Sequence, residues 1–347
     1  MNRVDLTALM LSTILVAVCT AGLSSEPANA DEAEAVKTLR RQGARIEVGQ
    51  GTAWRLDLSD TQIDDSQLVH LDELRELREL DLSRCEHVTN AGLANAKNLT
   101  LLNMLSIADS KIGDGGLIYL KRMAQLRELD LSTPRVTDSG LAQISGLSEL
   151  KTVNLRDATV TDAGLVHLKP LVRLRSLNLA DTRITDAGLK HLTELRQLEQ
   201  LWIFRNAIGD AGLRYLVDLP RLRELYVNRS QVSDAGLCHI GRISRLEVLW
   251  VHITQITDTG MIELANLRRL RELSLKGVRI TDAGLAHIAP LTRLEVLSVR
   301  DTLVTDAGVD SLSQFSKLKE LDVAGTPISD EGLVRLQAAL PNCVILK

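Results

Sequence analysis

Residues 177–200 combine two hydrophobic periodicities that predict a strand followed by a short helix. Leu177 and Leu179 alternate with polar or small neighbours, which is typical of a half-buried strand. The stretch 185–188, Thr-Asp-Ala-Gly, supplies a hydroxyl and a carboxylate suited to a helix start. After it, leucines recur at every third position and predict one apolar stripe of a short helix: Leu189, Leu192, Leu195 and Leu198.

The same unit recurs along most of the chain. An unbroken period of this length predicts a solenoid, in which each copy stacks on its neighbours. One copy, at Arg84 to Val88, carries an extra residue, which we expect a local bulge to absorb without changing the register of the sheet. The period of 24 is marked by glycines: Gly92, Gly116, Gly140, Gly164, Gly188, Gly212, Gly236, Gly260, Gly284, Gly308 and Gly332.

Residues 174–184 follow the pattern L-x-x-L-x-L-x-x-T-x-I and continue as T-D-A-G-L. This pattern resembles the leucine-rich repeat of bacterial secreted proteins and of the ribonuclease-inhibitor-like group, over about residues 54–346. The resemblance implies an α/β fold, a curved leucine-rich-repeat solenoid or horseshoe with a parallel β-sheet on the concave face and short helices on the convex face. Such proteins share a shape and not a reaction, so the resemblance implies no particular activity.

The chain divides into four segments. Residues 1–30 read as a signal peptide, because the apolar run 6–23 is followed by Ala28-Asn29-Ala30, small residues that a signal peptidase accepts. An uncleaved anchor is the alternative, since the first residues carry little net positive charge. Residues 31–53 predict an N-terminal cap, with a flexible linker as the alternative. Residues 54–340 hold twelve repeats, and residues 341–347 form a closing C-terminal strand.

Composition agrees with an exported protein, either periplasmic or extracellular. The formal net charge is −4, from 41 basic and 45 acidic residues, and this balance gives no electrostatic signature for nucleic acid. After residue 30 no apolar run approaches the length of a membrane span.

The recurring aspartates of the Thr-Asp-Ala-Gly stretch allow two interpretations. We interpret them as helix caps, because carboxylates favour the positive end of a helix, and not as a ladder of calcium ligands. The sequence indicates no closed metal site and no cofactor. It also lacks a phosphate-binding glycine loop and the G-x-S-x-G, H-E-x-x-H and C-x-x-C patterns, so we predict that the protein is not an enzyme.

The outward-pointing strand residues on the concave face are not fixed by core packing, so they can determine which ligand binds. They change along the chain, being acidic in the early copies, aromatic in the middle copies and basic in the later ones. Half of the eight aromatic residues fall on three consecutive copies, and exposed aromatics with nearby arginines are typical of binding sites. The predicted partner-binding residues are Trp202, Phe204, Arg205, Tyr226, Asn228, Arg229, Trp250, His252, Lys276 and Arg300.

These observations predict a rigid recognition scaffold that binds a protein or peptide through its concave face. A carbohydrate-binding module is an alternative, because aromatic rings also stack on sugars, and a purely structural envelope protein is another. On a third interpretation the aromatics only suit strands and fill the inner curve by stacking on each other.

Overall fold

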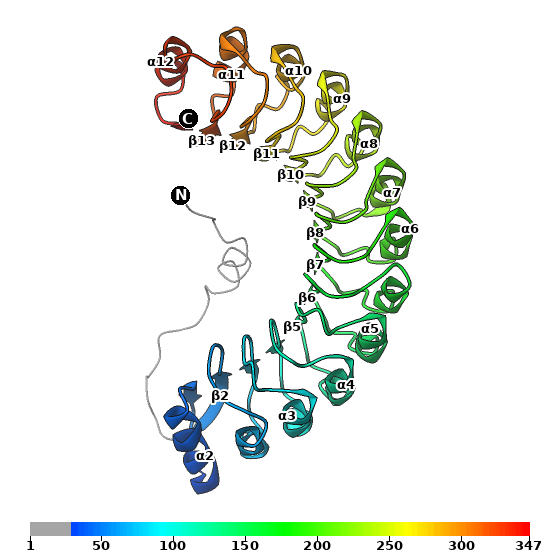
Figure 1. Cartoon of the computed structure of the whole chain (residues 1–347), viewed down its shortest axis with the longest axis vertical. Coiled ribbons are helices and arrows are strands. Elements are labelled where there is room, and N and C mark those ends of the chain that lie inside the picture. The colour runs from blue at the N-terminus through cyan, green and yellow to red at the C-terminus, as the bar shows by residue number, and fades with distance from the viewer. Residues whose placement is uncertain (1–28) are drawn as a thin grey trace.

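A computed structural model of the protein describes residues 29–347, which form an open arc (Figure 1). The strands line the inner side of the arc and the helices lie on its outer side. The predicted α/β solenoid, with a parallel sheet on the concave face and short helices on the convex face, is therefore confirmed. Most of the expected signal peptide, residues 1–28, lies outside the described residues.

The described residues form one sheet of 14 strands that follow each other in chain order. The first two strands pair antiparallel, and each later strand pairs parallel with the one before it, because every repeat crosses over the outer side before it returns. The bounds are β1 Arg45–Gly49, β2 Thr52–Asp57, β3 Glu79–Asp81, β4 Met104–Ser106, β5 Glu128–Asp130, β6 Thr152–Asn154, β7 Ser176–Asn178, β8 Gln200–Trp202, β9 Glu224–Tyr226, β10 Val248–Trp250, β11 Glu272–Ser274, β12 Val296–Ser298, β13 Glu320–Asp322 and β14 Val344–Leu346.

Equivalent positions of consecutive repeats lie side by side in this sheet. Trp202 pairs with Tyr226, and Tyr226 pairs with Trp250. The extra residue between β3 and β4 does not disturb the register, as expected, since Leu80 still pairs with Leu105. A column of the concave face can therefore be read directly from the sequence.

The convex side consists of short α-helices and 3-10 turns. A spacing of three residues between leucines suits the 3-10 form, in which positions i and i+3 lie above each other. The α-helices are α2 Ala30–Arg41, α3 Asn90–Leu93, α4 Asp114–Leu117, α5 Asp138–Ile144, α6 Asp186–Leu189, α7 Asp210–Leu213, α8 Asp234–Ile240, α9 Asp258–Leu264, α10 Asp282–His287, α11 Val309–Ser313 and α12 Asp330–Ala339. The 3-10 segments are η1 Gln67–Glu73, η2 Ala94–Asn98, η3 Ile118–Arg122, η4 Gly164–Leu168, η5 Lys190–Leu192, η6 Arg214–Asp218 and η7 Asp306–Gly308.

One hydrophobic core runs between the sheet and the helices through the whole arc. At its N-terminal end, helix α2 buries Val36 and Leu39 against the first repeat. The Glu32 carboxylate fixes this helix, because its Oε1 accepts a hydrogen bond of 2.6 Å from the Ala53 amide. Helix α2 and strand β1 thus occupy the segment for which an N-terminal cap was expected.

The aspartates of the repeats connect neighbouring copies. Thr185 caps helix α6, since its hydroxyl accepts from the Ala187 amide at 3.3 Å. The carboxylate of Asp162 accepts from both the amide and the hydroxyl of Thr185, each at 2.7 Å. Our interpretation of the aspartates as helix caps is therefore wrong in its detail. The hydroxyl caps the helix, and the aspartate of the preceding copy, held in its own first turn, reaches across to that hydroxyl.

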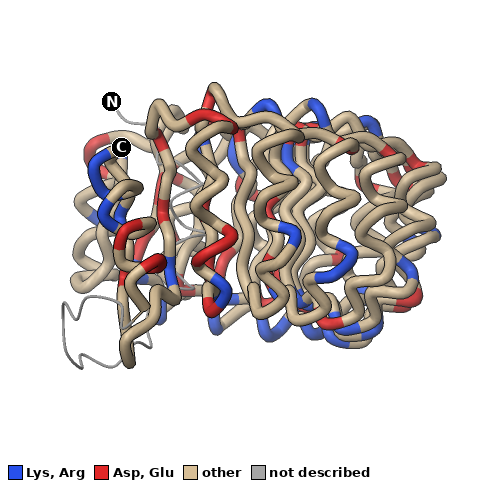
Figure 2. Tube along the Cα trace, turned by 90° about the horizontal axis from the view of Figure 1, so that it is seen from below, with Lys and Arg blue, Asp and Glu red and all other residues tan. Residues whose placement is uncertain are grey.

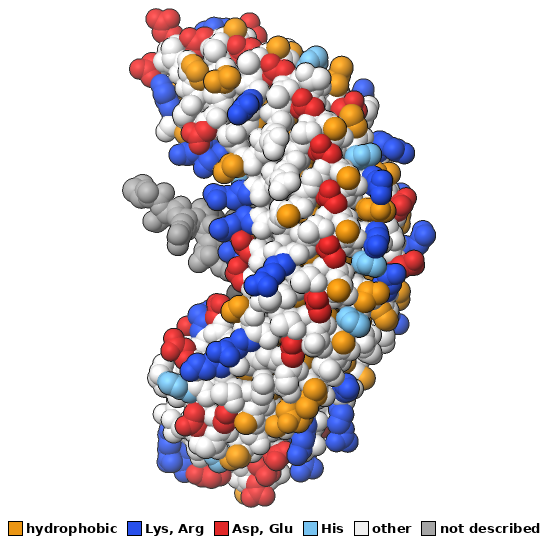
Figure 3. All heavy atoms as spheres, turned by 45° about the vertical axis from the view of Figure 1, so that its right-hand side comes forward, with side chains coloured by type: hydrophobic (Ala, Val, Ile, Leu, Met, Phe, Trp, Pro, Cys, Tyr) orange, Lys and Arg blue, Asp and Glu red, His pale blue; other side chains and the backbone are white. Residues whose placement is uncertain are grey.

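Charges of both signs occur along the whole arc (Figure 2). On the face seen in Figure 3, hydrophobic side chains are scattered among charged ones. The exposed aliphatic residues Val166, Val172 and Ile262 belong to this scattered type and need no partner to explain them. In the described part of the chain, no helix is long and apolar enough to cross a membrane.

Candidate binding surface on the concave face

The aromatic cluster on the concave face consists of Trp202, Tyr226 and Trp250, with Phe204 packed beside them. The first three are the last residues of β8, β9 and β10, so the parallel register places them in one column. The rings of Trp202 and Tyr226 stack with centroids 5.0 Å apart and planes 4° from parallel. Trp250 meets Tyr226 edge to face at 5.1 Å and 75°. Such contacts stabilise a pair of rings by about 0.5–1.5 kcal/mol beyond their buried area.

Two rings of the cluster are buried, which corrects the expectation that all of them are exposed. Trp202 is 7% exposed and Tyr226 is 8% exposed, and Ala180 packs against them. Strands about 4.8 Å apart bring equivalent rings into contact, so each ring covers the next one. Phe204 and Trp250 are only partly buried. The accessible part of the cluster therefore lies at Phe204 and Trp250.

Glutamates at the other end of the strands hold the rings in place. The Tyr226 hydroxyl donates to Glu224 Oε2 at 3.0 Å, and Trp250 Nε1 donates to Glu272 Oε1 at 2.6 Å. Burial raises the pKa of Glu272, and the nearby carboxylates of Glu224 and Glu320 add to this. Burial also raises the pKa of Tyr226. These glutamates were not predicted from the sequence, although glutamate at the first strand position of β9, β11 and β13 was a visible signal.

His252 continues the surface beyond Trp250. The two rings lie 5.7 Å apart, and His252 Nδ1 is 3.2 Å from the Ser274 hydroxyl. Burial lowers the pKa of His252 to about 4, and Arg229 and Lys276 contribute to the shift. At neutral pH the imidazole is therefore uncharged.

Asn228 occupies the position in its repeat that Phe204 and His252 occupy in theirs. It is 5% exposed, and its Oδ1 has no hydrogen-bond partner among the described residues. A buried acceptor without a partner costs about 1–3 kcal/mol. The expected binding residue thus lies in the centre of the surface, but its side chain and its unpaired Oδ1 are buried.

The turns that follow β8, β9 and β10 form a rim, made of Arg205, Arg229 and Ile253. All three have left-handed backbone conformations, with φ of 56°, 54° and 55°. Arg205 Nε forms an ion pair of 2.9 Å with Asp181 Oδ1, and both arginines are exposed. Ile253 is 42% exposed. A β-branched residue in this conformation is strained. Ile253 was not predicted from the sequence, although most other copies carry aspartate, arginine or glycine at this position.

Lys276 and Arg300 do not present free positive charge, in contrast to the expectation of a basic surface in the later copies. Lys276 Nζ lies 3.9 Å from Asp301 Oδ2, and Arg300 Nε lies 3.6 Å from the same oxygen. Arg300 Nη1 also lies 4.0 Å from Asp322 Oδ2. The two side chains share the carboxylate of Asp301, which offsets part of their charge.

The early copies carry the expected acidic residues, but part of their charge is paired. Asp57 forms an ion pair of 2.8 Å with Arg45, and Glu79 lies 3.6 Å from Arg55. Burial raises the pKa of Glu128, and the Glu79 carboxylate contributes. None of the expected binding residues lies in this part of the surface.

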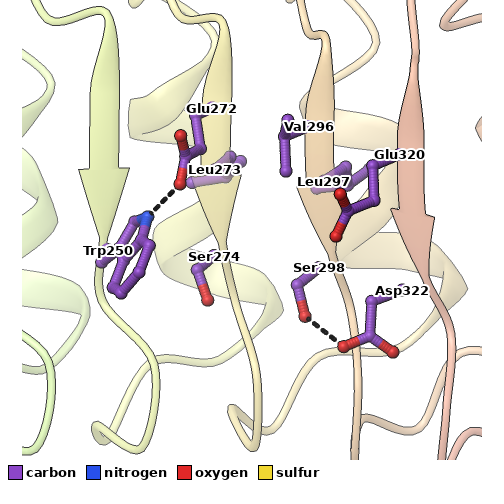
Figure 4. A pocket seen from close by; sticks show the side chains of 9 residues that line it. All are labelled: Trp250, Glu272, Leu273, Ser274, Val296, Leu297, Ser298, Glu320 and Asp322. Atoms are coloured by element: carbon purple, nitrogen blue, oxygen red, sulfur yellow. Dashed lines mark hydrogen bonds between the residues drawn. The ribbon is translucent and has the colours of Figure 1, made fainter. Parts of the chain in front are cut away.

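A small cavity of about 180 Å³ opens on the concave face immediately after the aromatic cluster (Figure 4). Trp250 forms one side of it and Asp322 lies at the other side. Between them the column contains only Ser274 and Ser298, so large rings are followed by two small side chains. This change in size leaves the space that the cavity occupies.

Two sequence-family models match the chain. A model described as "Leucine-rich repeat region" matches residues 56–283, and a model described as "Leucine Rich repeat" matches residues 316–336. No curated protein sequence matches the chain.

Several solved structures resemble the chain. An internalin, InlF, from Listeria monocytogenes is 20% identical with a TM-score of 0.66, over 93% of this chain and 96% of that one. An internalin C2 from the same species is 25% identical with a TM-score of 0.49, over 74% and 100%. A TDR receptor is 17% identical with a TM-score of 0.55, over 79% and 52%. The likenesses to InlF and to the TDR receptor concern the fold.

Proposed function

The chain belongs to the leucine-rich repeat family, and on that basis we propose that it is a non-catalytic recognition scaffold that binds a protein or peptide through its concave face. Proteins of this family generally serve as scaffolds for protein interactions, because the stacked repeats present a long concave surface. The proposed surface comprises the aromatic cluster, His252 and the rim, and it needs no cofactor.

The aromatic cluster is the observation that supports this proposal most strongly. Trp202 and Tyr226 form a packed base, on which Phe204 and Trp250 are held with part of their surface accessible. Rings fixed in this way lose little conformational freedom on binding, so a few of them can supply most of the affinity. The exposed, strained Ile253 beside Trp250 adds an apolar contact at the rim.

The carbohydrate alternative receives less support. A sugar ring stacks on an open aromatic face, but the faces of Trp202 and Tyr226 cover each other. A purely structural role does not explain why a strained β-branched residue, Ile253, is kept at the exposed rim. Protein or peptide binding accounts for it, since a partner supplies apolar contacts.

We further propose that the protein is exported to the periplasm or the cell exterior. This proposal depends on the apolar run 6–23 and the small residues 28–30 that follow it. N-terminal sequencing of the protein recovered outside the cytoplasm tests it. A new N-terminus near Asp31 is expected after cleavage, whereas an intact Met1 would support an uncleaved anchor.

Selection from a random peptide library displayed on phage tests the binding function. Peptides enriched by the wild-type chain should bind the Trp250→Ala variant about 30-fold more weakly, as expected for an anchor worth about 2 kcal/mol. Trp54→Ala is the matched control, because Trp54 lies on β2, far from the cluster along the sheet. Equal binding to both variants would place the site elsewhere, and binding to a glycan array without peptide enrichment would favour the carbohydrate alternative.

A further inference from the structure

The cavity beside Trp250 is lined by uncompensated negative charge. Glu272 and Glu320 line it from β11 and β13, and neither forms an ion pair within residues 29–347. Glu272 uses one oxygen to accept from Trp250 Nε1, which leaves its other oxygen for a ligand. Figure 4 shows the two carboxylates on either side of Val296.

Asp322 adds a third carboxylate at the far side of the cavity. Its Oδ2 accepts from the Ser298 hydroxyl at 3.3 Å and lies 4.0 Å from Arg300, which is shared with Asp301. Lys276 lies 3.9 Å from Asp301, and Lys319, which precedes Glu320, pairs with Glu295. These positive side chains thus pair with Asp301, Asp322 and Glu295, and none of them pairs with Glu272 or Glu320.

We propose that this cavity is a subsite for a cationic side chain, a lysine or an arginine of the peptide or protein partner. The proposal rests on the proposed function, because it names the chemistry of the partner at one point of the same surface. Glu272 and Glu320 supply acceptors, the serine hydroxyls of Ser274 and Ser298 supply further acceptors, and Trp250 supplies an aromatic wall. A cation beside an indole ring and within reach of a carboxylate is stabilised by both.

The arrangement of the carboxylates favours an organic cation over a metal ion. Glu272 and Glu320 lie two strands apart, which corresponds to about 10 Å of sheet. One of the carboxylate oxygens, Glu272 Oε1, is already engaged by Trp250 Nε1. In the described residues no cluster of three or more histidine, cysteine or acidic side chains has the geometry of a metal site. A side chain with several N–H donors spans such a cavity.

The burial of Glu272 is consistent with this role. The pKa of Glu272 is raised by its burial and by the like charges of Glu224 and Glu320. The ionised carboxylate is therefore less stable in this position than it would be in water. A bound cation would offset this loss. The ring of Trp250 is positioned by the same carboxylate, which links the subsite to the aromatic cluster.

The first test uses a small cationic probe, the acetylated and N-methylamidated arginine derivative, with the corresponding norleucine derivative as the uncharged control. The Trp250 indole N–H resonance, assigned with Trp250→Phe, should shift on titration with the arginine probe and not with norleucine at equal ionic strength. The Glu272→Gln/Glu320→Gln variant should lose at least tenfold in affinity for the arginine probe. Glu79→Gln, a substitution of another half-buried strand glutamate outside the cavity, should leave it unchanged.

The second test separates failure of this inference from failure of the proposed function. Peptides selected through Trp250 should contain a basic residue whose replacement by norleucine costs at least tenfold with the wild type and nothing with the double glutamine variant. Trp250-dependent peptides that bind both proteins equally would overturn the cation subsite and leave the proposed function intact. Glutamine still accepts from Trp250 Nε1, so the variant should fold, and its melting curve checks this.

Discussion

The backbone of Gly188 passes so close to the carboxylate of Asp162 that a Cβ atom on Gly188 would collide with Asp162 Oδ1. The carboxylate cannot move aside cheaply, because it accepts two hydrogen bonds from Thr185. Gly188 lies in helix α6 and has no unusual φ. The glycine that marks the period of the sequence is therefore required by the neighbouring repeat and not by its own backbone conformation.

Substitution of this glycine should be destabilising. Gly188→Ala is expected to lower the free energy of unfolding by about 1–3 kcal/mol, the usual cost of overpacking. Gly146→Ala is the matched control, because a Cβ there has no neighbour within 4 Å. Urea denaturation of the two variants measures the difference, and equal effects would show that the contact with Asp162 is not what selects glycine.

Removal of the opposing carboxylate should partly rescue the alanine variant. Asp162→Ala alone loses the two hydrogen bonds to Thr185, so we expect it to be destabilising as well. In the double variant the new methyl group meets no carboxylate. The loss in the free energy of unfolding should therefore be smaller than the sum of the losses in the two single variants. Strict additivity would contradict the proposed collision.

The aspartates of the repeats should not bind calcium. Both oxygens of Asp162 are already engaged by Thr185, and the same pairing occurs in other copies, such as Asp258 with Thr281. We therefore expect the melting temperature to change equally little in millimolar calcium and millimolar magnesium. A specific rise in calcium, measured by calorimetry, would show that these groups are available to a metal ion.

The tryptophans of the cluster should differ in their contribution to stability. Trp202→Ala is expected to cost about 3–5 kcal/mol, because Trp202 is 7% exposed and stacks on Tyr226. Trp250→Ala should cost clearly less, since Trp250 is only partly buried. Urea titrations of both variants check this order. Equal costs would mean that Trp250 is as deeply packed as Trp202, and would weaken its proposed role as an accessible anchor.

The fold could be predicted from the sequence because its signal is repeated many times. The alternation of Leu177 and Leu179 and the three-residue spacing after Gly188 recur copy after copy, so local errors cancel. The direction of the aspartate side chains could not be predicted in this way. Asp162 and Thr185 lie 23 residues apart, and their contact depends on how neighbouring copies stack.

The candidate surface could be predicted only in part. Alternation places Trp202, Tyr226 and Trp250 on the concave face, which the structure shows. Their burial depends on ring packing between strands, which alternation does not describe. The cavity could not be predicted either, because it results from two small residues, Ser274 and Ser298, that follow large ones in the column.

The rim residue Ile253 should limit stability. Its φ of 55° is unfavourable for a β-branched residue, and asparagine adopts this conformation more readily. Ile253→Asn is therefore expected to raise the free energy of unfolding by about 1 kcal/mol. Leu303→Asn is the control, an exposed aliphatic residue outside the left-handed region. If both variants change stability equally, Ile253 is not strained. Weaker peptide binding by the stabilised Ile253→Asn variant would identify Ile253 as a residue kept for recognition.

The histidine beside Trp250 should make the folded chain sensitive to acid. Burial lowers the pKa of His252 from 6.5 to about 4, with repulsion from Arg229 and Lys276, so the folded chain binds this proton less tightly than the unfolded chain. The resulting stability is present above about pH 6.5 and is lost as the pH falls towards 4. Between pH 7 and pH 5, the wild type should lose about 1–2 kcal/mol more than His252→Gln, which is neutral throughout.

Urea denaturation of the wild type and His252→Gln at the two pH values measures this difference directly. The other charged groups of the surface are the same in both proteins, so their effect cancels to first order. Ser274 can still donate its hydroxyl to the glutamine oxygen, which keeps the local hydrogen bond. Parallel pH profiles would show that His252 is protonated as readily in the folded chain as in the unfolded one. A steeper loss in the wild type would show that His252 gains its charge only at a pH at which the folded chain is less stable. At neutral pH His252 is then uncharged, so it does not repel a cationic partner at the cavity beside Trp250.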